Sequence, residues 1–258
     1  MLTFNNLELA IFISDFFWPL VRILAFFSTA PIFNDQNVNK KIKIILSILI
    51  VFLIKPFLPK IHIELFSVIG LFLLFQQILI GIVLGLTCQF LFAAFNLSGE
   101  IIGLQMGLSF ANFFNVNRNI GTSIISRWLN VLTLFFFLIL NTHLYLIFML
   151  IDSFYSIPID VNFFNSNIFF VLLKFSGSIF LNALIFILPI MIFLLLSTLI
   201  MSILNRLSPQ ISIFSIGFPL NLLIGMLMLY YLMSISFPFF KSLLNQLISF
   251  TSYTFLKM

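Results

Sequence analysis

The sequence contains very little charge. Only 7% of its 258 residues are Asp, Glu, Lys or Arg, whereas 62% are hydrophobic. A water-soluble domain has about 25% charged residues. A soluble fold of this size could not cover its surface with so few charges. The chain is therefore expected to place its apolar surface against lipid or against other subunits.

Cysteine and the residues of common catalytic sites are also scarce. The one cysteine, Cys88, lies inside an apolar run, which excludes an internal disulfide and a cysteine metal cluster. We interpret it as a small buried residue. The two histidines, His62 and His143, have no second ligand near them in the sequence, and no phosphate loop or nucleophile motif occurs. We therefore expect no catalytic residue, no metal, no cofactor and no enzymatic activity.

Basic residues exceed acidic ones, but they do not form a nucleic-acid-binding face. The formal charge is +5, and the twelve Lys and Arg residues are scattered along the chain. The one cluster is Lys40, Lys41 and Lys43, which lies between apolar segments, where loop charges of membrane proteins are common. Nucleic-acid binding normally needs a basic patch or stripe, so we expect no nucleic-acid partner.

Three apolar runs are each long enough to cross a bilayer. Glu64 and Glu100 are separated by 35 uncharged residues. Arg206 is separated from Lys174 by 31 such residues, and from Lys241 by 34. A helix needs about 20 apolar residues to cross a hydrocarbon core of about 30 Å. None of the runs has the alternation of an outer-membrane strand, so helices are favoured over a barrel.

We therefore predict an all-α integral membrane protein that forms one domain over residues 1–258. The apolar segments are placed at 8–33, 42–59, 65–96, 128–151, 168–204 and 210–240. The first should end at Pro31, because proline disfavours a helical conformation of the residue before it. Pro189 and Pro219 should kink the last two segments. Asp15 and Arg22 lie on one face of the first segment, where each needs a partner, either the other residue or a group on another helix or subunit.

The stretch 98–114 is the most unusual part of the sequence. Gly99, Gly103 and Gly107 are spaced by four, a pattern that lets another backbone approach closely. On the same helical face we place a bulky set that consists of Met106, Phe110 and Phe113, with Phe114 beside them.

An ordinary, tightly packed helix would explain the glycines of this stretch. Two further features favour a short helix that leads into a loop and lines a cavity. Glu100 is costly to bury alone, and the bulky set is followed by polar, turn-prone residues at Asn112, Asn115, Asn117, Arg118 and Asn119. Met and Phe side chains there would form a deformable apolar plug.

A second polar interruption occurs at 205–219. Arg206 and Gln210 interrupt about 60 apolar residues, and Pro209 indicates a hairpin between two long helices. This stretch is either a solvated turn or a polar tip that docks a partner through Arg206.

At these two stretches the chain resembles the FliR family, which is shared with the corresponding subunit of virulence type III secretion systems. The matching residues are 98–111, 205–210 and 216–219, with Arg22, Pro31 and 141–143 in support. The resemblance covers nearly the whole chain in order. The amino-acid sequence of 103–111 favours the flagellar branch over the virulence branch, which stays the alternative.

The resemblance implies a subunit of the flagellar protein-export gate. Such a subunit would form a helical, multi-subunit pore with FliP and FliQ in the bacterial inner membrane, at the flagellar basal body. FlhB and FlhA would associate with this gate, membrane lipid would surround part of it, and unfolded flagellar subunits would pass through it. The residues 103–119 would form a re-entrant plug that includes Gly103, Gln105, Met106, Gly107, Phe110, Phe113, Phe114 and Asn115. Partner contacts would involve Glu100, Arg206, Pro209 and Gln210.

A stand-alone solute transporter is a different class of membrane protein that the composition allows. It would be expected to show inverted repeats, broken helices and paired charges inside the membrane. The sequence shows no convincing repeat, so we favour the export-gate subunit.

Overall fold

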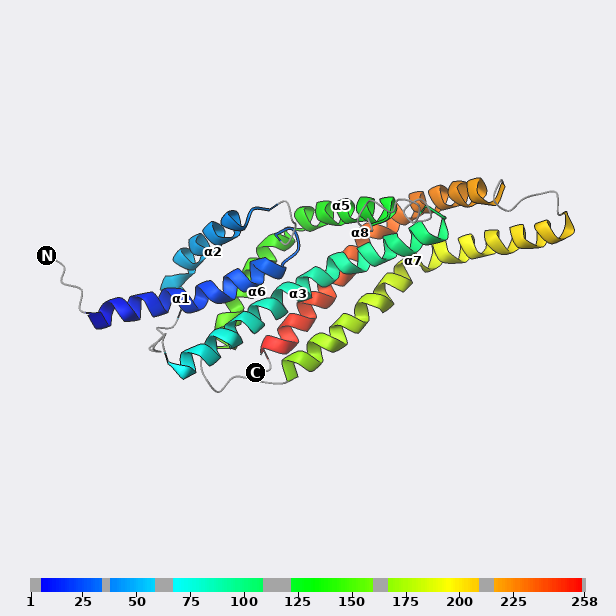
Figure 1. Cartoon of the computed structure of the whole chain (residues 1–258). Helices are drawn as coiled ribbons and strands as arrows, with labels where there is room; N and C mark the ends of the chain where they lie inside the picture. The colour runs from blue at the N-terminus through cyan, green and yellow to red at the C-terminus, as the bar shows by residue number, and fades with distance from the viewer. Residues whose placement is uncertain are drawn as a thin grey trace. The chain divides into compact units, whose positions relative to one another are not determined.

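The computed structural model describes residues 6–33, 38–58, 67–108, 122–159, 167–208 and 216–256. Within these ranges the chain is helical and contains no strand, which confirms the predicted all-α class (Figure 1). The elements are α1 (Asn6–Thr29), α2 (Lys40–Ile54), a 3-10 turn η1 (Lys55–Phe57), α3 (Val68–Gln105), α5 (Ile124–Ile139), α6 (Thr142–Ser156), α7 (Asn167–Leu207) and α8 (Phe218–Leu256).

Several helix ends follow from local residues. Helix α1 ends at Thr29, two residues before Pro31, as predicted. Helix α2 begins after Asn39, whose side chain accepts a hydrogen bond from the backbone of Lys41 at 3.2 Å. Helix α5 begins after Ser123, which caps the helix in the same way. Such caps satisfy N–H groups that have no partner inside the helix.

Two of the helices extend further than the segments predicted for them. Helix α3 continues past residue 96 to Gln105, and α8 continues past residue 240 to Leu256. Helix α8 therefore includes Pro238 and the charged Lys241. Pro219 was expected to kink this segment but lies at the second residue of α8, where a helix tolerates proline.

The predicted segment 128–151 is wrong as a single helix. It is two helices, α5 and α6, separated at Leu140 and Asn141. Asn141 has a φ of 52° and lies in the left-handed region. Asparagine adopts this conformation more readily than most residues, so an apolar run that reads as continuous is interrupted by one backbone conformation.

The described residues divide into two compact units. The first consists of the described residues within 1–90, 141–175 and 247–258. In it, α2 packs on α1, and Trp18 of α1 packs on Leu73 of α3. Close packing of α1 and α3 requires Gly81, because a Cβ there would lie 2.7 Å from the Cβ of Ala25.

The second unit consists of 91–140 and 176–246. Its core is aromatic: Phe95 of α3 contacts the rings of Phe186, Phe239 and Phe240. Phe186 of α7 stacks on Phe239 of α8 with ring centroids 4.5 Å apart. Helices α3, α7 and α8 each contribute to both units, and the single domain over 1–258 stays a prediction.

Among the residues that the structure describes, three helices are long and apolar enough to cross a membrane. They are α3, the 35 residues Leu173–Leu207 of α7 and the 34 residues Phe218–Thr251 of α8. The pair α5 and α6 provides a fourth candidate if it is counted as one span. The predicted apolar helices of a membrane protein are thus present, and large parts of them face outward.

Candidate functional site

A cluster of hydrogen bonds joins the first turn of α5 to the last turns of α3. We call this the loop-base cluster: Asn96, Gly99, Glu100, Ser123 and Ser126. A carboxylate oxygen of Glu100 accepts a hydrogen bond from the backbone N–H of Ser123 at 2.9 Å. The hydroxyl of Ser123 donates to the carbonyl of Gly99 at 3.1 Å. The charge that seemed costly to bury therefore has a donor within the chain.

Ser126 completes the loop-base cluster. Its backbone N–H donates to the hydroxyl of Ser123 at 3.1 Å, which makes Ser123 the N-cap of α5. Its own hydroxyl donates to the carbonyl of Asn96 at 3.2 Å and to the side-chain oxygen of Asn96. A Cβ on Gly99 would lie 2.8 Å from the backbone nitrogen of Ser126. The first turn of α5 can therefore reach α3 only because residue 99 has no side chain.

At the end of α3 the chain turns out of the helix. Gly107 has a φ of 81°, which favours glycine, and its N–H donates to the carbonyl of Leu104 at 3.0 Å. Met106 is buried against Gly225 of α8, where a Cβ would lie 2.7 Å from the Met106 sulfur. Met106 therefore fixes the last residues of α3 against α8.

The structure places the predicted plug and packing residues in three groups. Gly99 and Gly103 lie buried on α3, with Glu100 and Gln105 partly exposed. Gly107 was expected on the same helical face, but it lies beyond the end of α3. The expected short separate helix at 98–114 is also wrong, because 98–105 is the last part of a 38-residue helix. Phe110, Phe113, Phe114 and Asn115 lie outside the described residues.

The predicted partner residues are less completely placed. Arg206 is exposed in the last turn of α7. Pro209 and Gln210 lie outside the described residues.

Arg22 lies in the first unit and is fully buried. Its Nε donates to Gln77 of α3 at 2.6 Å. Its two terminal nitrogens donate to the carbonyls of Ser153 and Ile157 at 2.8 and 2.9 Å. These carbonyls belong to the end of α6, where the helix dipole favours a cation. The sequence allowed Arg22 to pair with Asp15, with another helix or with another subunit. The structure shows it bound to groups on two other helices of the same chain, α3 and α6.

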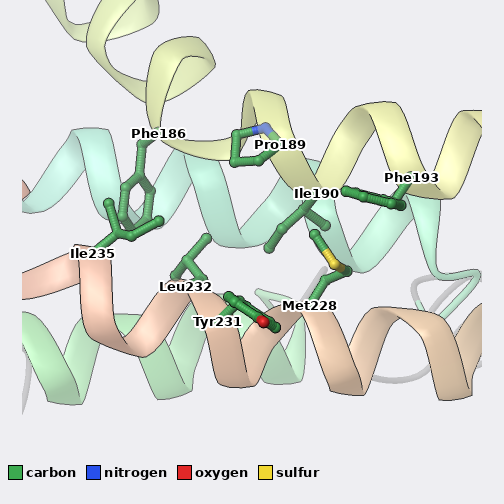
Figure 2. Close-up of a pocket in the computed structure, with 8 residues that line it drawn as sticks. All are labelled: Phe186, Pro189, Ile190, Phe193, Met228, Tyr231, Leu232 and Ile235. Carbon is green, nitrogen blue, oxygen red and sulfur yellow. The ribbon is translucent and has the colours of Figure 1, made fainter.

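Helices α7 and α8 separate beside Pro189 and leave an apolar cleft (Figure 2). Its volume is about 480 Å³. Phe186 and Phe239 stack at one end. Beyond the other end, Ser197 of α7 donates to Asn221 of α8 at 2.5 Å. The side chains facing into it are Phe186, Pro189, Ile190 and Phe193 of α7, and Met228, Tyr231, Leu232 and Ile235 of α8.

Comparison of the sequence with known protein families identifies the family of this chain. The family model of bacterial export proteins, family 1, matches residues 13–247. The chain belongs to family 1 of the bacterial export proteins.

Relatives in this export family carry a flagellar name. The chain is 82% identical to the flagellar biosynthetic protein FliR of Buchnera aphidicola subsp. Schizaphis graminum (strain Sg), over 258 residues and all of both chains. It is 46% identical to the protein of that name from Escherichia coli (strain K12) over 232 residues, 90% of this chain and 89% of the relative. For the Borreliella burgdorferi protein of that name the identity is 33% over 227 residues, 85% and 81% of the two chains. The chain is thus a membrane protein of flagellar biosynthesis and protein export.

Sequence reasoning about this export-family chain missed the partners of its glycines and charges. Ser123, Ser126, Gln77 and Gly225 were not singled out, although each contacts a residue that was. Ser123 could have been found, because a serine directly before an apolar run is a helix N-cap signal. Gly225 and Gln77 have no such local signal, since their roles depend on side chains far away in the sequence.

Proposed function

We propose that this chain is a subunit of the flagellar export gate in the bacterial inner membrane, at the basal body. In this role it assembles with FliP-like and FliQ-like subunits into a pore that passes unfolded flagellar subunits. FlhB-like and FlhA-like proteins associate with the pore. The role is that of a conduit, and no residue is assigned a catalytic function.

The observation that carries this proposal is the amount of outward-facing apolar surface on α7 and α8. The apolar part of α7 is 35 residues long, or about 52 Å at 1.5 Å per residue. A hydrocarbon core is about 30 Å thick. Even a strongly tilted helix leaves part of this length outside the core. Other subunits provide the apolar cover that this surface needs, as expected for a multi-subunit gate.

The segment 103–119 is assigned to the plug that closes the pore at rest. In support, the loop-base cluster holds residue 123 next to residues 99 and 100, so the chain between them forms a closed loop. Met106 packs on Gly225 of α8 and so fixes the point at which the chain leaves α3. A loop with fixed ends can place bulky apolar side chains reproducibly, which a seal requires.

Complementation tests the function. The chain is expressed in an Escherichia coli strain that lacks its own FliR, and the hook subunits secreted into the medium are measured together with swimming. We expect both to be restored, because the chain is 46% identical to that relative over 89% of the relative's length. Co-purification of FliP and FliQ checks that the chain has assembled. Assembly without any secretion would contradict the proposed function.

Removal of the plug tests its assignment separately. Deletion of 107–117 should give a leaky gate, seen as ion entry into cells that express the assembled complex. A second variant, in which Phe110, Phe113 and Phe114 are replaced by serine, keeps the loop length and should also leak. If the deletion left the membrane as tight as wild type while export continued, the plug would lie elsewhere.

A further inference from the structure

Helix α2 has one buried and one exposed apolar face. Ser47, Val51 and Ile54 are buried, on the side where α2 packs against α1. The opposite stripe follows helical spacing and is strongly exposed; it consists of Ile42, Ile45, Leu49, Phe52 and Leu53. Phe52 alone is 75% exposed. This stripe therefore needs an apolar environment that the described part of the chain does not provide.

The length of α2 does not suit a membrane span. Its 15 residues extend about 22 Å, whereas crossing the core needs about 20 residues and 30 Å. A 3-10 turn with Pro56 follows directly and ends the α-helix. Helix α2 can therefore enter one leaflet but not cross both.

The N-terminal turn of α2 concentrates positive charge. Lys40 and Lys41 are exposed and Lys43 is partly exposed. The first turn contains no acidic residue, and no carboxylate forms an ion pair with these three lysines among the residues that the structure describes. Three cations at the positive end of a helix dipole repel one another and oppose the dipole. An external anion would relieve both effects.

We propose that α2 is a lipid-binding element, in which Lys40, Lys41 and Lys43 contact the phosphates of anionic lipids and the stripe from Ile42 to Leu53 lies among their acyl chains. The inference is independent of the plug and of the pore. It rests on charge gathered at one end of the helix, an apolar body beyond it and a length of about one leaflet with its headgroups. A partner subunit would need a carboxylate cluster to match the lysines, whereas an anionic leaflet presents phosphates at that depth throughout.

The first experiment measures lipid selectivity. The full chain, with the subunits that accompany it from the membrane, is placed in nanodiscs of phosphatidylcholine with added phosphatidylglycerol. Retained phosphatidylglycerol is counted by native mass spectrometry. Each lysine near an anionic surface strengthens association roughly five-fold. The double variant Lys40→Gln, Lys41→Gln should therefore retain clearly fewer phosphatidylglycerol molecules.

The matched control is Lys174→Gln with Lys241→Gln, which removes the same charge from exposed positions on α7 and α8. It should retain the wild-type number of phosphatidylglycerol molecules. An equal loss in both double variants would show a net-charge effect only, and no loss in either would show that α2 binds no anionic lipid. Either result overturns the proposal.

The second experiment identifies what covers the stripe. A nitroxide is attached at Phe52→Cys, and at Val51→Cys as the buried control, in a chain with Cys88→Ala. At position 52 we expect a mobile label with high oxygen and low nickel-chelate accessibility, which is the signature of lipid. An immobile label that neither reagent reaches would indicate a covering subunit. High nickel-chelate accessibility would indicate water. Both of these outcomes contradict the proposal.

Discussion

The guanidinium of Arg22 connects three helices by itself. It donates to Gln77 of α3 and to the two carbonyls at the end of α6, and it lies 4.2 Å from the ring centre of Phe154. Hydrogen bonds to charged groups each contribute about 1.5–3 kcal/mol. Alanine removes these bonds but also the desolvation cost of burying the charge, so Arg22→Ala should lower the free energy of unfolding by about 3 kcal/mol, or roughly 10 °C in melting temperature for a chain of this size. Arg22→Lys should recover only part of this, because an ammonium cannot reproduce the planar fork.

The chain contains its own probe for this measurement. Cys88 is the one cysteine and is fully buried, so a thiol-reactive fluorophore reports unfolding in detergent. The matched control is Arg127→Ala, because Arg127 is exposed and donates to Thr122 at 3.2 Å. It should melt close to wild type. Equal melting temperatures for Arg22→Ala and wild type would show that the buried contacts of Arg22 do not hold the helices together.

Two glycines on long helices should respond to alanine with opposite signs. At Gly99 a Cβ would meet the backbone of Ser126, and such overpacking costs about 1–3 kcal/mol. At Gly177 the added Cβ would have no contact within 4 Å. Alanine should therefore raise the free energy of unfolding, by at most about 1 kcal/mol, through its higher helix propensity. In the same thiol assay Gly99→Ala should melt below wild type and Gly177→Ala at or above it. The same sign for both would contradict the packing described for α3 and α5.

At the scale of elements, the sequence predicts the presence of a helix better than the residues at which it begins and ends. Charge-free runs and Pro31 are local signals, and the helices that depend on them are present. The stretch 98–105 looked like a break because glycines and Glu100 seemed unsuited to a long helix. Within the fold the glycines allow contact and Glu100 accepts a hydrogen bond from Ser123, so α3 continues. The candidate site could be located from the sequence, but its partners on α5 and α8 depend on tertiary contacts.

The break between α5 and α6 depends on one backbone conformation. Asn141 is in the left-handed region, which costs other L-residues roughly 1–2 kcal/mol. Asn141→Gly should preserve the melting temperature, whereas the β-branched Asn141→Ile should lower it by several degrees. If Asn141→Ile instead joined α5 and α6 into one helix, circular dichroism would show increased helicity and melting would not fall. The break would then not be required by the rest of the fold.

At the scale of the whole molecule, the exposed stripe of α7 can be tested as a surface for other subunits. Ile192, Leu196, Leu199 and Ile203 follow one another at helical spacing and are all exposed, whereas Leu194 and Met201 point inward. The stripe continues to Arg206, which is predicted to contact a partner. Other subunits would therefore be expected to meet a continuous surface, apolar along its length and cationic at its end.

A polar residue in this stripe should separate assembly from folding. Leu199 is 64% exposed, so Leu199→Gln should leave the thiol-monitored melting of the chain alone close to wild type. Burying an amide without a partner in an interface costs about 1–3 kcal/mol, so FliP-like and FliQ-like subunits should co-purify in detergent roughly ten-fold less well. Met201→Gln provides the contrast, because Met201 is buried and its variant should melt early. Since detergent replaces lipid in this measurement, undiminished co-purification with Leu199→Gln would mean that lipid, and not another subunit, covers this part of α7.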